Sequence, residues 1–191
     1  MLVPNTGKIA SGMIFFGSDE RQRFNRLLLR NSGQDYNKTF FRDALLQGLV
    51  QDLDFDTQLY RPARLFINGD DWGIYNIRER YDHHYFRLKH NIQEENLDVI
   101  EHTFDDGITA SIGDTIAYEQ LEQFIREHDM SESQNYEKVA QKINLNSLLD
   151  YYISQIYFDN NDWPHNNYTS IERSHMGNGS SPYLIPMLVL I

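Results

Sequence analysis

An aspartate and an asparagine near the C-terminal end of the chain have the types and the spacing that phosphoryl transfer requires. Asp162 precedes Asn167 by five positions, within the segment DNNDWPHNN that covers residues 159–167. In phosphotransferase catalytic loops of this spacing, the aspartate orients the attacking hydroxyl and the asparagine holds a metal ion. Aspartate and asparagine are also ordinary turn residues, whose side chains bond their own backbone. The spacing leaves both interpretations open.

A helix that ends just before this loop should hold it in place. Asn146 is a suitable N-cap, and apolar residues recur after it at helical spacing. We therefore expect a helix over residues 147–158 with a wide buried face. Pro164 prevents the regular helix from continuing and favours an extended conformation for the residue before it. The expected buried positions are Leu148, Leu149, Tyr152, Ile153 and Ile156.

The composition predicts a folded chain and disfavours several classes of partner. Of 191 residues, 40% are hydrophobic and 13% aromatic, as in a domain with a real core. The formal net charge of −11 disfavours nucleic acid and anionic membranes, because phosphate groups require a basic surface. The chain has no cysteine, so it can form neither a disulfide nor a thiolate metal site. We also expect no membrane span, because no apolar run is long enough.

The pattern of apolar residues and turn formers predicts an α+β fold. We expect the whole chain, residues 1–191, to form a single domain. The clearest feature is a hairpin whose turn is placed at residues 69–71. In chain order, the expected elements are a strand over 23–30, a helix over 39–52, the hairpin over 64–78, an amphipathic segment to about 90, a strand over 97–102, a loop over 104–114, and helices over 117–128, 136–143 and 147–158.

The helix expected over residues 39–52 carries apolar residues at intervals that predict burial of most of its circumference. Arg42 and Asp43 lie on it. Their simplest interpretation is a surface or interhelical ion pair that contributes little to stability.

Three blocks of sequence resemble the CotH kinase family, named for spore coat protein H. They are LLLRNSGQDYNKTFFRDALLQGLVQDLDFDTQ, YRPARLFINGDDWGIYNIRERYDHHYF and YYISQIYFDNNDWPHNN, and they occur in the family's order. The resemblance covers about residues 22–168 and leaves 169–191 as a divergent tail. It implies a protein-kinase-like fold, with a small antiparallel sheet or hairpin and a helical lobe. It also implies transfer of a phosphoryl group from ATP, with Mg²⁺, to serine or threonine hydroxyls of proteins.

The resemblance also assigns roles to individual residues. It implies that Asp162 orients the nucleophile and that Asn167, or alternatively Asn166, binds the metal. Asp159 begins the same loop and is the reserve candidate for the catalytic acid. Glu79, at the end of the hairpin, would line the nucleotide site. The alternative for Glu79 is a solvent-facing charge paired with Arg78 or Arg80.

Two parts of the family pattern are not recognisable in this chain. The family carries a phosphate-binding lysine upstream of the first block, where this sequence has only Lys8 in a segment that does not match. The family's second acidic metal ligand is also missing, because no Asp or Glu follows Glu172. We therefore expect a truncated member, incomplete at both ends, with weak or absent catalysis. Strands left without partners would expose edges, one of which the apolar tail 183–191 could cover.

Two other functions remain open from the sequence. The first is a non-catalytic pseudokinase or structural module of a spore coat or cell surface. The second is a secreted carbohydrate-binding or adhesion module, in which Trp72 and Trp163 stack on sugars; anchoring of both rings in the core or a loop is the alternative. The resemblance implies a protein substrate, or a surface or coat protein, as partner, and a bacterial envelope, spore-surface or exported location.

Overall fold

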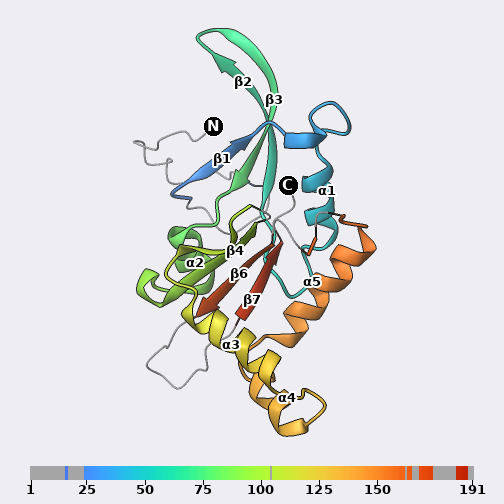
Figure 1. Ribbon diagram of the computed structural model, residues 1–191. Helices are drawn as coiled ribbons and strands as arrows, with labels where there is room; N and C mark the ends of the chain where they lie inside the picture. Colours follow the sequence, from blue (N-terminus) through green and yellow to red (C-terminus); the bar gives the residue numbers. More distant parts are fainter. Residues whose placement is uncertain are drawn as a thin grey trace. The chain divides into compact units, whose positions relative to one another are not determined.

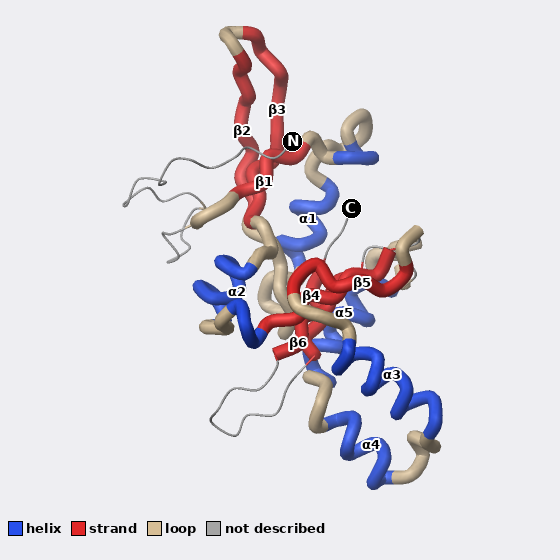
Figure 2. The backbone as a smooth tube through the Cα atoms, turned by 60° about the vertical axis from the view of Figure 1, so that its left-hand side comes forward, coloured by secondary structure: helices blue, strands red, loops and turns tan. Residues whose placement is uncertain are grey.

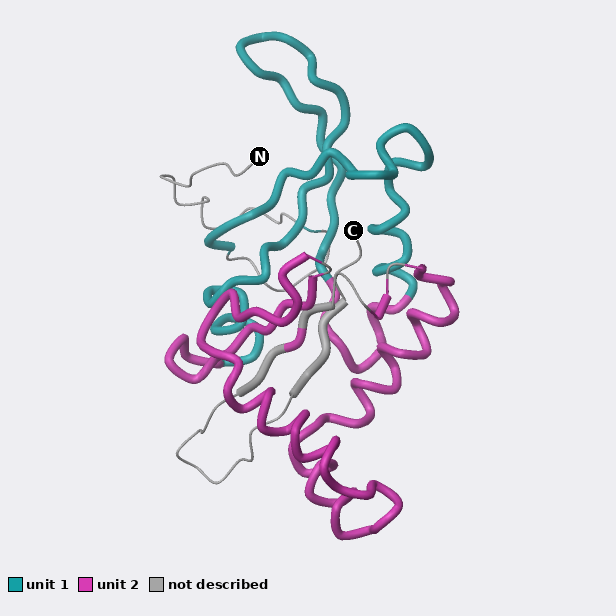
Figure 3. The backbone as a smooth tube through the Cα atoms, viewed as in Figure 1, with its two compact units in different colours: residues 1–49, 58–91, 191 teal, residues 50–57, 92–190 magenta. Residues whose placement is uncertain are grey.

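The computed structural model describes residue 16, residues 24–103, 105–161, 163 and 164, and residues 168–173 and 184–188, the last two segments by their backbone and the side chain of Ser170. The chain divides into two compact units (Figure 3). Unit 1 comprises residues 1–49, 58–91 and 191, and unit 2 comprises residues 50–57 and 92–190. The expectation of an α+β fold is confirmed, because both units combine helices with an antiparallel sheet.

Unit 1 is built around the predicted hairpin, which forms two strands of an antiparallel sheet (Figure 1). Its turn lies at Asn68 and Gly69, one position earlier than expected, and Asp70 already pairs with Ile67. Both turn residues have positive φ, 54° and 92°, which suits the twist of a two-residue hairpin turn. The strand order is β1-β3-β2, with β1 at Leu27–Arg30, β2 at Tyr60–Ile67 and β3 at Asp70–Glu79.

The helices of unit 1 are short. Asp82 caps the helix α2, at His83–His90, because its Oδ1 accepts hydrogen bonds from the backbone N–H groups of His84 and Tyr85. The expected burial of the helix over 39–52 is wrong: within the observed helix only Gln47 is buried, while Leu45 and Leu49 are exposed. The helical elements are η1 at Gly33–Asp35, α1 at Arg42–Leu49 and α2 at His83–His90.

Unit 2 contains a four-stranded antiparallel sheet in the order β5-β4-β6-β7. The strand expected over 97–102 is β4, and the expected loop over 104–114 contains a further strand, β5, that pairs with it. The apolar tail supplies β7, which pairs with β6 and forms one edge of the sheet, as expected for a segment that covers a strand edge. The bounds are Leu97–Thr103 for β4, Gly107–Ile112 for β5, Tyr168–Arg173 for β6 and Leu184–Leu188 for β7.

Three helices complete unit 2, after a short η2 at Glu94–Asn96. Figures 1 and 2 both show α3 and α4 side by side. Val139 of α4 and Ile143 form a buried cluster, against which residues of α3 and α5 pack. The three helices thus share an apolar contact at this cluster. The helices are α3 at Ile116–Glu127, α4 at Ser133–Ala140 and α5 at Leu145–Tyr157.

Helix α5 is present as predicted, but its cap and its buried face differ from the prediction. Asn144, rather than Asn146, caps it, because the Asn144 side chain accepts a hydrogen bond from the Ser147 N–H. The face expected to be buried is exposed at four positions, Leu149, Tyr152, Ile153 and Ile156, and only Leu148 is half-buried. The residues that α5 does bury are Ser147, Tyr151, Ser154 and Gln155.

Candidate active site

The loop proposed for catalysis leaves α5 through a tightly bonded turn. Asp159 has a positive φ of 51°, which reverses the chain direction directly after the helix. The Asn160 backbone N–H donates to the Gln155 carbonyl at 3.1 Å. The Asn160 side chain also donates, to Gln155 Oε1 at 2.6 Å. Because Gln155 is itself buried, these two bonds fix the start of the loop to the interior of unit 2.

Trp163 fixes the loop a second time. Its indole lies at right angles to the Tyr152 ring, with 4.7 Å between the ring centroids, and also contacts Tyr151 at 6.3 Å. Its backbone N–H donates to the Asn160 carbonyl, and the bond to Pro164 is cis. For Trp163 these contacts agree with the loop-anchoring interpretation.

Three of the four loop residues singled out from the sequence lie outside the described residues: Asp162, Asn166 and Asn167. Their roles therefore remain predictions. Asp159 is described, and it is exposed at the start of the loop, where its backbone carbonyl accepts a hydrogen bond from the Asn161 side chain. The described flanks show that the segment with Asp162 begins at a fixed point of unit 2.

Glu79 is deeply buried at the end of β3, with 2% of its surface exposed. The interpretation of Glu79 as a solvent-facing charge is therefore wrong. Its Oε2 accepts a hydrogen bond from the backbone N–H of Leu59 at 2.9 Å. Its own backbone carbonyl accepts one from the Gln58 side chain at 3.0 Å. The carboxylate thus joins the end of β3 to the segment that enters β2.

Asp43 is the centre of an ion-pair cluster in unit 1. Its Oδ2 lies 2.7 Å from Arg78 Nη1 and 3.3 Å from Arg30 Nη1. Burial lowers the pKa of the Arg78 guanidinium from its ordinary value, and the neighbouring Asp43 carboxylate acts in the opposite direction. The interpretation of a weak surface pair holds for Arg42, half-exposed beside Asp35, but not for Asp43, whose partner Arg78 is almost fully buried.

Buried amides extend this polar interior of unit 1, which the sequence did not predict. Gln47 accepts a hydrogen bond from the Gln58 N–H at 2.6 Å and donates to Asp43 at 2.8 Å. Asn76 donates to Ser32 Oγ and to the Phe40 carbonyl. The sequence signal available for Asn76 and Arg78 was their alternation on β3, which places both on one face of the strand.

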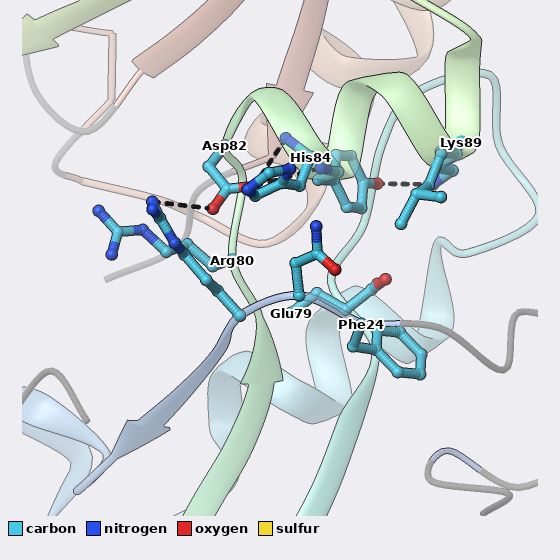
Figure 4. Close-up of a pocket in the computed structure, with 10 residues that line it drawn as sticks. Phe24, Glu79, Arg80, Asp82, His84 and Lys89 are labelled. Carbon is cyan, nitrogen blue, oxygen red and sulfur yellow. Dashed lines mark hydrogen bonds and ion pairs between the residues drawn. The ribbon is translucent and has the colours of Figure 1, made fainter. Parts of the chain in front are cut away.

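Glu79 also lines a small pocket of unit 1, shown in Figure 4. The pocket is bounded by the segment that leads into β1, by the end of β3 and by α2, and Arg80, Asp82 and Lys89 contribute to its wall. As the described residues bound it, its volume is about 20 Å³, which accommodates one water molecule. Asp82 is occupied here as the α2 cap and as the partner of Arg26 at 3.4 Å.

The structure also bears on Trp72, on metal sites and on membrane-spanning helices. Trp72 is 57% exposed near the tip of the hairpin, so the core or loop-anchoring interpretation is wrong for this ring. Among the residues that the structure describes, no three His, Asp or Glu side chains converge as a metal site. Within the same part of the chain, no helix is long and apolar enough to cross a membrane.

The comparison with protein families agrees with the three blocks of sequence. The family model described as CotH kinase protein matches residues 8–178, which extends beyond the expected range of 22–168 at both ends. A search of curated proteins found no match. The matched region contains the hairpin with Glu79, helix α5 and the loop with Asp162 and Asn167. Since it covers most of the chain, this protein belongs to the CotH kinase protein family.

Proposed function

We propose that the chain is a kinase-like domain that binds ATP with Mg²⁺ and transfers a phosphoryl group to protein serine or threonine hydroxyls. Asp162 orients the attacking hydroxyl. Asn167, with Asn166 as the alternative, binds the metal, and Glu79 lines the nucleotide site. Bound Mg²⁺ would neutralise charge on the phosphates.

The attachment of the loop to α5 is the observation that best supports this proposal. Phosphoryl transfer depends on positioning, because the protein contributes little covalent chemistry. A loop that carries a catalytic aspartate therefore needs a rigid base. The Gln155–Asn160 bonds and the packing of Trp163 on Tyr152 provide such a base on both sides of Asp162.

The burial of Glu79 limits what it can do in this site. Its Oε2 accepts a hydrogen bond from the Leu59 N–H, so the carboxylate first links the end of β3 to the residue before β2. A role toward nucleotide is compatible with this hydrogen bond, because a carboxylate accepts several hydrogen bonds. Glu79 would then position a neighbouring cation rather than contact the transferred phosphoryl group.

Transfer of label from γ-labelled ATP and Mg²⁺ to casein, with autophosphorylation as a second readout, tests the proposal. We expect weak transfer, because the second acidic metal ligand is not recognisable in this sequence. Asp162→Asn should reduce it by about 10²–10⁴-fold, the usual contribution of a positioned general base. Asp159→Asn is the matched control in the same loop and should leave transfer unchanged.

The same assay separates the proposal from its alternatives. Loss of transfer in Asp159→Asn instead of Asp162→Asn would move the catalytic role to Asp159. Equal transfer in the parent chain and both variants would contradict a catalytic aspartate in this loop. No transfer and no ATP binding by the folded chain would favour the non-catalytic coat or surface module.

A further inference from the structure

A second, larger pocket lies entirely within unit 2 and is not used by the proposed chemistry. Its volume is about 380 Å³, within the range of small-molecule sites. Its lining residues come from strands β4 and β5, helices α3 and α5, Ile143 and the Trp163–Pro164 segment. The wall is mainly aromatic and aliphatic, with a carboxylate and an imidazole among the lining groups.

Four rings form two perpendicular pairs in the wall of this pocket. Tyr152 and Trp163 meet at 88° with 4.7 Å between centroids, and His102 and Tyr118 meet at 77° with 5.3 Å between centroids. A pocket lined by several aromatic rings and a carboxylate contains the groups from which cages for methylated ammonium ions are built.

Glu122 adds negative charge to this aromatic wall. Burial raises the pKa of Tyr118 to about 12, and the charge of Glu122 and the neighbouring Tyr152 act in the same direction. Burial lowers the pKa of His102, while Glu122 opposes that shift. The carboxylate therefore acts on ring groups from both β4 and α3. Burial thus disfavours the positively charged form of His102.

Glu122 forms an ion pair with Arg126, one turn further along α3. Arg126 Nη2 lies 2.7 Å from Glu122 Oε1; the Arg126 side chain is well exposed and that of Glu122 is partly exposed. An exposed pair of this kind contributes little, so a ligand cation can compete with Arg126 for the carboxylate. An anionic ligand such as a nucleotide would face Glu122 without a cation among the lining residues.

We propose that this pocket binds a small organic cation with a methylated ammonium group, held by Tyr118, Tyr152, Trp163 and Glu122. The rings contribute cation–π attraction and apolar contact to the methyl groups, and Glu122 supplies the compensating charge. The readout is binding of the cation itself, so the test does not depend on phosphoryl transfer.

Tryptophan fluorescence gives a direct test, because the chain has only two tryptophans. Trp72→Phe removes the exposed hairpin tryptophan and leaves Trp163 as the single reporter. Choline is the first probe, and its uncharged isostere 3,3-dimethyl-1-butanol is the matched control. We expect a saturable change in Trp163 emission with choline and at least about tenfold weaker binding of the isostere. An N-acetyl trimethyllysine amide tests whether the methylated ammonium comes from a protein side chain, in which case it binds more tightly than choline.

Variants in the same background test the cage itself. Glu122→Gln and Tyr152→Leu should each weaken choline binding about tenfold. Tyr152→Phe keeps the ring face and should retain binding. Glu119→Gln, which removes another carboxylate of α3 that bonds Thr115, is the control for charge. Circular dichroism confirms that each variant is folded. Equal affinity for choline and its isostere, or no saturable change, would overturn the proposal.

Discussion

The guanidinium of Arg78 on β3 lies 2.7 Å from the carboxylate of Asp43 on α1, and the Arg78 side chain is only 2% exposed. A nearly buried charge of this kind is tolerated only when it is paired and hydrogen-bonded. Arg78 Nη2 also reaches the Gln58 carbonyl at 3.5 Å. Polar groups thus join the sheet of unit 1 to α1.

Removal of the Asp43 charge should destabilise the protein strongly. Asp43→Asn leaves the buried Arg78 without its counter-ion, and loss of one partner of a buried pair costs about 3–5 kcal/mol. Urea unfolding measures the change. The control is Asp71→Asn, which breaks the fully exposed Arg64 pair and should leave the midpoint unchanged. Equal midpoints for the two variants would show that the Arg78 pair is not buried in solution.

Two substitutions of Glu79 separate its structural role from a role toward nucleotide. Glu79→Ala removes the acceptor of the Leu59 N–H, so it should lower the free energy of unfolding by about 1–3 kcal/mol. Glu79→Gln keeps an oxygen acceptor and should be much milder. If Glu79→Gln is stable but loses ATP binding, the charge itself acts on the nucleotide site. Equal destabilisation by both variants would contradict the hydrogen-bond interpretation.

Helix α5 offers a comparison between its two faces. Tyr151 is fully buried and packs edge-to-face on Phe55, so Tyr151→Ala should cost about 3–5 kcal/mol. Ile153 is 61% exposed, so Ile153→Ala should change stability by no more than about 0.5 kcal/mol. Thermal unfolding of the two variants measures the difference. A larger loss for Ile153→Ala would mean that its face is covered in solution.

Two half-buried imidazoles predict a pH dependence of stability. Burial lowers the pKa values of His84 and His102 below the ordinary value of 6.5, so the folded chain binds their protons more weakly than the unfolded chain. Stability should therefore be full above about pH 6.5 and fall as the pH drops toward the folded pKa values. His102→Asn should make this decline shallower. An unchanged pH profile of the unfolding midpoint in His102→Asn would contradict the shift at this residue.

The sequence predicted the elements better than it predicted their faces. The Asn68–Gly69 hairpin and the 3.6-residue periodicity of α3 and α5 are local signals, and these elements formed as expected. Strand β5 was missed because Gly107 and Gly113 make its segment resemble a loop, although pairing with β4 stabilises it. Pairing partners distant in sequence are not readable from a local pattern.

The errors in burial have a common physical origin. For α1 and α5, apolar periodicity was taken to mark the buried face, yet the buried positions include Gln47, Ser154 and Gln155. Hydrogen bonds to the side-chain oxygens of the two glutamines offset the cost of burial, as between Gln47 Oε1 and the Gln58 N–H or between Gln155 Oε1 and the Asn160 side chain. Such partners follow from tertiary geometry. For the candidate site, the position of the loop after α5 was predictable, whereas the burial of Glu79 was not.

Calorimetric titration of the chain with ATP, with and without Mg²⁺, tests the central proposal most directly. Asp162→Ala is the test variant, and Asp159→Asn is the control in the same loop because asparagine tolerates the positive φ at this position. We predict Mg²⁺-dependent binding that is lost or strongly weakened in Asp162→Ala and retained in Asp159→Asn. Absence of ATP binding by the folded parent chain, or identical Mg²⁺-dependent binding by the parent and Asp162→Ala, would contradict the assignment of a nucleotide site that uses Asp162.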